Sequence, residues 1–273
     1  MLTIAVCVKQ VVDPEAPLSL FEIAPDGKNL VPPPGTPPVL SAFDENALEA
    51  ALRVKDTAGA KIIVLSLGNN LAKPVRKKTI AAGADELILL EDEAFEALDS
   101  AQTARALARA IEKLGGIDLV LCGRQAADTD AGRVGIGIAA LLDLPAVTVA
   151  RKLQVTGDRV RVERVTSDGH EVVEAPLPAL ITASNEVGEL RFPPVKATIA
   201  AQKVQPTIWT VDDLGLDLSV AARTFLEKYY VPDRNVQCEM ITGGSAAISP
   251  PAARIPKSVL CRPMKSLMAT GSV

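Results

Sequence analysis

Hydrophobic and polar positions in the first half of the chain alternate between two periods. Short aliphatic runs of strand length are followed by segments in which apolar residues recur every three or four positions. The predicted strands are residues 2–8, 61–67, 86–90 and 117–122. The predicted helices are residues 44–57 with Asp44 as N-cap, 71–82 ending at Gly83, and 100–114 ending at Gly115. Strands joined by helices of this length predict an α/β fold, Rossmann-like or adenine-nucleotide-hydrolase-like, whose mostly parallel sheet carries helices on both faces.

Other segments depart from this alternation. Residues 13–40 are rich in proline and predict a short hairpin with an extended loop. After Pro145, turn dipeptides such as Gly157-Asp158 predict antiparallel edge strands, at residues 146–155, 159–166, 170–175 and 178–184. Beyond a helical patch at 196–203 the pattern fades. We therefore expect an α/β domain over residues 1–208 and an extended arm over 209–273, which packs on a partner because its apolar groups would otherwise be exposed.

Residues 117–142 contain the strongest candidate for a binding site. An aliphatic strand ends at Gly123, a polar loop follows, and a helix of small residues begins near Gly132. Free N–H groups and the helix dipole attract an anion at such a corner, and Gly123 lets the backbone approach a ligand. The groups expected to serve a phosphate-bearing nucleotide are the cations Arg124 and Arg133, a helix cap at Thr129 or Asp130, and Asp128 for a ribose hydroxyl. The alternative is an ordinary strand-to-helix turn.

Two further corners precede helices at the same edge of the predicted sheet. They are residues 41–44, with Phe43 as a possible hydrophobic staple of a capped helix, and residues 66–68. Because the carboxyl ends of neighbouring parallel strands converge on one crevice, three such corners together strengthen the nucleotide interpretation. The loop matches neither the dinucleotide fingerprint nor the P-loop pattern.

Composition limits the remaining functions. The chain is 48% hydrophobic but only 3% aromatic, which suits helices packed on a parallel sheet. Its net charge of −4 provides no basic field, so no nucleic-acid partner is expected. No apolar run reaches the roughly 18 residues of a membrane span, and no membrane insertion is expected.

Catalytic and metal chemistry is poorly represented. His170 is the only histidine and lies in a predicted turn, so no two-histidine metal site is possible. Four scattered cysteines without a C-x-x-C motif, and an N-terminus unlike a signal peptide, indicate a reducing, cytoplasmic compartment. We expect no catalytic residue and no metal ligand, so that a cofactor carries any chemistry.

Six segments, in order, resemble the beta subunit family of electron transfer flavoproteins over roughly residues 1–240. They are residues 6–11 with Asp13-Pro14, 43–52, 81–85, 123–126, 168–169 with 171–182, and 213–216. The resemblance implies a heterodimer whose larger alpha subunit carries the redox FAD at the interface, while beta holds AMP structurally. Such a pair carries electrons from flavoprotein dehydrogenases, of the acyl-CoA type used in fatty acid oxidation or related, to a membrane quinone reductase.

The resemblance also assigns residues. The implied nucleotide contacts are Cys7, Ser41, Ala42, Phe43, Asp44, Leu67, Gly123, Arg124, Gln125, Ala126, Ala127, Asp128, Thr129, Asp130, Ala131, Gly132, Arg133 and Val134. Residues 191–200 correspond to a recognition loop that docks dehydrogenases through Arg191, Val195 and Lys196, with Val195 at the anchoring position. Without the resemblance, this stretch is a proline-bounded surface loop.

Departures from the family pattern leave an alternative open. The loop keeps Asp128, Asp130 and Val134-Gly135 of the bifurcating members, in which beta binds a second FAD and oxidises NADH, but Arg133 replaces their glutamine. Ser41-Ala42 replaces the usual Asn-Pro, and the tail after Ser249 resembles nothing in the family. A stand-alone adenine-nucleotide sensor of the universal-stress type is a third hypothesis, which leaves the long arm unexplained.

Overall fold

The computed structural model describes residues 1–96, 98–218, 222, 224–231 and 269–270. These residues fall into two compact units. The larger unit comprises Met1–Ala16 and Pro34–Phe225, and the smaller one comprises Pro17–Pro33 with the described residues from Leu226 onward. Each unit is described by itself, and the larger one contains all the candidate site residues.

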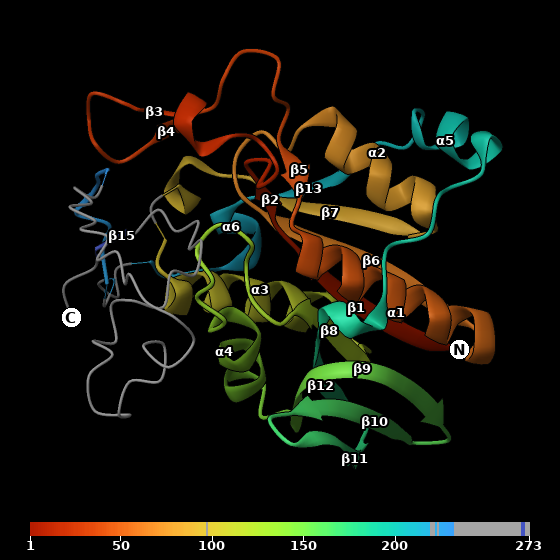
Figure 1. The fold of residues 1–273 in the computed structure, drawn as a ribbon. Coiled ribbons are helices and arrows are strands. Elements are labelled where there is room, and N and C mark those ends of the chain that lie inside the picture. Colours follow the sequence, from red (N-terminus) through yellow and green to blue (C-terminus); the bar gives the residue numbers. More distant parts are fainter. Residues whose placement is uncertain (97, 219–221, 223, 232–268, 271–273) are drawn as a thin grey trace, which may run out of the picture. The chain divides into compact units, whose positions relative to one another are not determined.

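A nine-stranded sheet forms the centre of the larger unit, in the order β11-β10-β9-β12-β8-β1-β6-β7-β13 (Figure 1). The strands are β1 (Leu2–Val8), β6 (Ala60–Leu67), β7 (Glu86–Leu90), β8 (Leu119–Gly123), β9 (Ala146–Thr156), β10 (Arg159–Thr166), β11 (Gly169–Pro176), β12 (Ala179–Ala183) and β13 (Thr207–Trp209). Neighbours from β13 to β9 are parallel, whereas β9, β10 and β11 pair antiparallel. The predicted fold class is therefore confirmed.

Helices cover both faces of this sheet (Figure 1). They are α1 (Ala42–Ala58), α2 (Lys73–Ala82), α3 (Ser100–Leu114), α4 (Val134–Leu141), α5 (Val195–Ala201) and α6 (Val211–Leu214). Successive strand residues point to opposite faces. Ile4 and Val6 accordingly pack in a core with α1 and α2, while Ala5 and Cys7 pack in a second core with α3, α4 and α6. The aliphatic, alanine-rich composition supplies both cores.

Local sequence accounts well for α3. Its buried residues Ala104, Leu107, Ala108 and Ile111 follow a helical spacing. Asp99 and Gln102 form a capping box at its N-terminus, and Gly115 follows its last residue with a φ of 63°. These signals fix both ends where the sequence predicts them.

The fourth predicted edge strand lies elsewhere. β12 is parallel to β8 and β9 and lies between them, inside the sheet rather than at its antiparallel edge. All five of its residues are buried, consistent with the mostly apolar sequence ALITA. In β10, by contrast, buried Val160 and Val162 alternate with exposed Arg159 and Arg161, as in an antiparallel strand with one face toward solvent. The single histidine, His170, is exposed on β11.

Short elements complete the chain. In the larger unit these are β2 (Gln10–Val11), paired with β5 (Val39–Leu40), and the 3-10 turns η2 (Glu93–Phe95) and η3 (Asn185–Val187). In the smaller unit they are η1 (Leu18–Leu20), the hairpin of β3 (Glu22–Ile23) and β4 (Leu30–Val31), and β14 (Lys228–Tyr229) paired with β15 (Ala269–Thr270). The hairpin is the one predicted in the proline-rich stretch.

The sheet continues through Trp209, the first residue of the predicted arm. β13 pairs with β7, and Leu214 of α6 is buried. Most of the arm, residues 232–268 and 271–273, lies outside the described residues, so its packing on a partner stays a prediction. Within the described part of the chain, no helix has the length and apolar character needed to cross a bilayer.

Close contact between α3 and α4 gives a test of the packing. A Cβ at Gly137 would lie 2.8 Å from the Cβ of Ala104. Gly137→Val should therefore push the helices apart and lower the free energy of unfolding by about 1–3 kcal/mol, measured by urea denaturation. Ala140→Val, at an exposed position of the same helix, should cost less than about 0.7 kcal/mol. Equal losses for the two variants would contradict the close approach.

Candidate nucleotide site and docking segment

The Asp44 carboxylate joins three elements at the carboxyl edge of the sheet. It accepts hydrogen bonds from the backbone N–H of Lys9, just after β1, at 2.8 Å, and of Gly123, the last residue of β8, at 3.1 Å. Asp44 lies in the first turn of α1, whose N-cap is Ser41. The predicted N-cap role of Asp44 is therefore wrong, because its carboxylate binds the two strand ends instead of its own helix.

Burial dominates the electrostatics of this carboxylate. Asp44 is 7% exposed. Removal from water raises the pKa of Asp44 to about 7, although the N–H groups of Lys9 and Gly123 act in the opposite direction. A group that titrates near neutrality therefore lies at the junction of β1, β8 and α1.

Gly123 is required by the same junction. A Cβ there would lie 2.5 Å from Oδ1 of Asp44 and 2.7 Å from the carbonyl carbon of Phe43. From the sequence, this glycine is expected to allow the approach of a ligand. The structure shows that the approach of α1 already excludes any side chain.

Arg124 connects two of the predicted corners. Its backbone N–H donates to the carbonyl of Ala183 at 3.0 Å, and its guanidinium carbon lies 4.7 Å from the centre of the Phe43 ring. Its Nε is buried and has no hydrogen-bond partner within the part of the chain that the structure describes. An unpaired buried donor is costly, so this atom is a candidate donor to a ligand.

The rest of the loop is open to solvent. Residues 128–133 are all exposed. Asp128 forms an ion pair of 2.7 Å with Lys9. A carboxylate accepts several hydrogen bonds, so the expected contact of Asp128 with a ribose hydroxyl stays a prediction. Asp130 has a left-handed φ of 52° and accepts from Nε2 of Gln125 at 2.7 Å.

The first turn of α4 is uncapped. Its N-cap is Arg133, which makes no side-chain capping bond, so the predicted cap at Thr129 or Asp130 is wrong. A Cβ at Gly135 would lie 3.2 Å from Cγ2 of Thr182, so this glycine allows the helix to pack closely on the sheet. The first N–H groups of α4 are therefore available to an anion.

The remaining predicted contacts lie at the same strand ends. Leu67 ends β6, the neighbour of β1, and Cys7 lies beside Cys122 in the register of β1 and β8. Both thiols are buried. The side-chain hydrogen bond between Cys122 and Cys7, together with burial, favours the neutral thiol and raises the pKa of Cys122 well above its ordinary value, so this thiol is not an activated nucleophile. In the described residues no cluster of three or more His, Cys, Asp or Glu offers a metal site.

The predicted recognition loop lies on the α1 and α2 side. Its most exposed apolar residues are Phe192 (95%), Val195 (77%) and Ile199 (56%). We call residues 192–199 the docking segment. Lys196 is exposed too, whereas Arg191 folds back onto α1.

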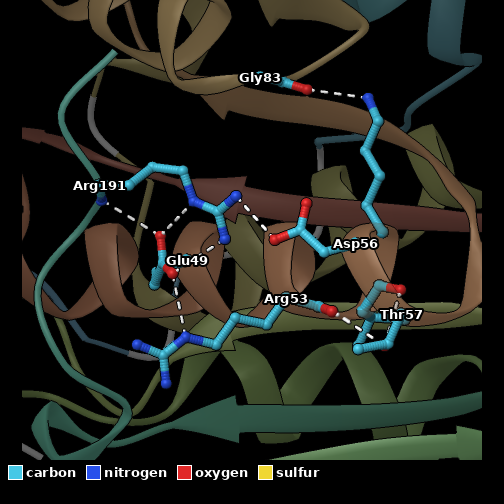
Figure 2. A network of polar contacts seen from close by, with 8 residues as sticks. Glu49, Arg53, Asp56, Thr57, Gly83 and Arg191 are labelled. Carbon is cyan, nitrogen blue, oxygen red and sulfur yellow. Dashed lines mark hydrogen bonds and ion pairs between the residues drawn. The ribbon is translucent and has the colours of Figure 1, made fainter. Parts of the chain in front are cut away.

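Sequence reasoning missed the partners of Arg191. Figure 2 shows its guanidinium between Glu49 and Asp56 of α1, with Arg53 on the other side of Glu49. A glutamate within the apolar run ALEAALRV was the available signal, because a buried carboxylate needs a cationic partner. Phe192, followed by two prolines, was the signal for an exposed aromatic group.

The fold defines the class of protein, and the comparison with known proteins identifies the family. An open, mostly parallel α/β sheet with loops at the carboxyl ends of its central strands is the architecture of doubly wound ligand-binding proteins. Residues 35–214 match the family model described as the electron transfer flavoprotein domain. The chain therefore belongs to the electron transfer flavoprotein family, and its relatives place it among the beta subunits.

Three relatives illustrate the match. Electron transfer flavoprotein subunit beta of Thermoanaerobacterium thermosaccharolyticum is 41% identical over 217 residues, which cover 79% of this chain and 81% of the relative. The protein of the same name from Megasphaera elsdenii is 38% identical over 243 residues, covering 85% and 88%. Caffeyl-CoA reductase-Etf complex subunit CarD of Acetobacterium woodii is 36% identical over 247 residues, covering 89% and 92%.

The pKa of Asp44 predicts a pH dependence of stability. The folded state holds a proton that the unfolded chain releases, since the ordinary value of 3.8 is raised to about 7. The free energy of unfolding should therefore fall as the pH rises from about 4 to about 7 and then level off. Asp44→Asn should remove this component. Urea denaturation of both proteins across this range measures it, and a difference between them that stays constant with pH would refute it.

Proposed function

We propose that this chain is the beta subunit of a heterodimeric electron transfer flavoprotein whose alpha subunit carries the redox FAD. In this proposal the pair carries electrons from flavoprotein dehydrogenases, of the acyl-CoA type or related, to a membrane quinone oxidoreductase. The observation that carries it is the family match over residues 35–214, which includes most of the strand-end corner and the whole docking segment. The two buried thiols fit a reducing compartment, and we propose the cytoplasm.

We propose AMP as the nucleotide of the beta subunit, with a structural role. The buried, unpartnered Nε of Arg124 and the uncapped start of α4 suit a phosphate. Arg133, at the exposed start of α4, adds positive charge. The FAD of alpha would supply the redox chemistry, while the residues of this chain bind, orient and dock.

The alternative is a bifurcating beta subunit that binds a second FAD and oxidises NADH. Asp128, Asp130 and the Val134-Gly135 pair favour it, as they match the bifurcating pattern. The relative CarD is a subunit of a caffeyl-CoA reductase-Etf complex by its name. Arg133, in place of the glutamine of that pattern, favours AMP.

Nucleotide content separates the two functions. We expect the purified heterodimer to release one FAD and one AMP on denaturation, measured by chromatography and absorbance. Two FAD and no AMP would establish the alternative.

Arg124→Ala tests the site itself. Loss of a charged hydrogen bond, worth about 1.5–3 kcal/mol, should weaken AMP binding at least tenfold and leave the FAD of alpha in place. Arg109→Ala, which removes an exposed arginine paired with Glu112 on α3, is the matched control and should retain AMP. Full AMP content in Arg124→Ala would remove this arginine from the site. Gly123→Val should also expel the nucleotide, but it disturbs the Asp44 junction as well.

Val195→Ala tests docking. Truncating an interface anchor typically costs about 1–2 kcal/mol, so the KM for an acyl-CoA dehydrogenase should rise about 5- to 30-fold with unchanged FAD and AMP content. Val172→Ala, the same change at an exposed position of β11, is the control and should leave KM unaltered. An unchanged KM for Val195→Ala would exclude Val195 as the anchor.

A further inference from the structure

We propose that Arg191 is a positioning residue, which fixes the docking segment to α1 through its contacts with Glu49 and Asp56. This inference rests on the proposed docking function. In this inference Arg191 sets the orientation in which the segment meets a dehydrogenase, whereas Val195 makes the direct contact.

Arg191 is bound to α1 through its main chain and its side chain. Its backbone N–H donates to Oε2 of Glu49 at 3.2 Å, and its Nε donates to the same oxygen at 3.0 Å. One terminal nitrogen donates to Oε1 of Glu49 at 3.1 Å, and the other lies 2.8 Å from Oδ2 of Asp56 (Figure 2). This bidentate geometry fixes both the distance and the direction of the guanidinium.

The Glu49 carboxylate is buried and charged. Only 6% of its side chain is exposed. Burial acts to raise the pKa of Glu49, but the hydrogen bonds from Arg191 and Arg53 outweigh it and hold this pKa below the ordinary value. A buried carboxylate that loses its main partner is strongly unfavourable, so the pair stays closed.

Residues just before Arg191 are held by the same face of α1. The side-chain amide of Asn46 donates to the carbonyl of Gly188 at 2.7 Å, and Leu190 is buried in the core. Asn46, Glu49 and Asp56 lie three and seven residues apart, which places them on one face of the helix. Arg191 is the last of these attachments before the chain becomes exposed.

The docking segment has little apolar burial of its own, although its helix α5 lies against α2. No residue between Arg191 and Ala201 is buried. Pro193 and Pro194 follow Phe192 directly, and Pro194 has a φ of −60°. Proline restricts its own φ and also the residue before it, so the short link transmits the orientation of Arg191 to Val195 with little freedom. The ion pair therefore adds a directional contact to the buried Leu190 at the base of the segment.

The test uses the complete heterodimer with FAD and AMP bound. Arg191→Ala should raise the KM for an acyl-CoA dehydrogenase roughly fivefold or more, with kcat at saturation and cofactor content unchanged. Arg191→Lys should recover part of this loss, since lysine keeps the charge but not the fork of donors. Arg109→Ala should change nothing. A KM equal to that of the parent in Arg191→Ala would overturn the proposal.

A double mutant separates positioning from general stability. Once the anchor is truncated, its orientation no longer matters, so Arg191→Ala should raise KM much less in a Val195→Ala background than in the parent. Fully additive effects would overturn the proposal. Glu49→Gln, which keeps the shape of the side chain, should reproduce the effect of Arg191→Ala, and a parental KM in that variant would count against it.

Hydrogen exchange tests the inference without a dehydrogenase. Amides of residues 192–199, apart from the prolines, should exchange faster in Arg191→Ala, while those of β1 and β8 stay protected. Unchanged exchange in the docking segment would overturn positioning. An unchanged KM for Val195→Ala combined with faster exchange in Arg191→Ala would instead defeat the docking function and leave the mechanical role of Arg191 intact.

Discussion

The hydrogen bonds of the buried Asp44 carboxylate set the geometry on which the candidate site depends. Removing a carboxylate from water is unfavourable, and the N–H groups of Lys9 and Gly123 offset part of that cost. These bonds fix the first turn of α1 against the ends of two central strands. The Phe43 ring, which precedes Asp44, is thereby placed under the guanidinium of Arg124. The two hydrogen bonds of Asp44 thus position the ring that the Arg124 side chain contacts.

α1 links the two regions to which we assign binding. Its first turn forms the strand-end corner, and its next turns carry Glu49 and Asp56, which hold Arg191 (Figure 2). Glu49 lies five positions after Asp44, which is about 7.5 Å along a helix. A helix is stiff over this length, so α1 holds the strand-end corner and the base of the docking segment at a fixed distance and orientation from each other. The family match covers both regions.

The sequence predicts those features of the fold that residues close together in the chain determine. α3 was predictable because its apolar spacing, its capping box and Gly115 all lie within the helix or next to it. β12 was predictable as a buried strand, but not as a neighbour of β8, since strand order depends on the path of the whole chain. The decisive polar contacts are equally distant in sequence: Asp44 binds residues 35 and 79 positions away, and Glu49 binds Arg191 across 142 positions. The resemblance to the beta subunit family assigned roles to residues 123–134 and 191–200, whose function the pattern of apolar and polar residues left open.

The exposed character of residues 192–200 has an evolutionary consequence. Side chains that bury nothing contribute little to folding, so they are replaced at small thermodynamic cost. Under the proposed docking function, Phe192, Val195 or Ile199 can be exchanged to suit a new redox partner, while the ion pairs of Arg191 and the α/β domain stay constant. In this way, variation confined to residues 192–200 would change the electron donor without changing the fold of the α/β domain.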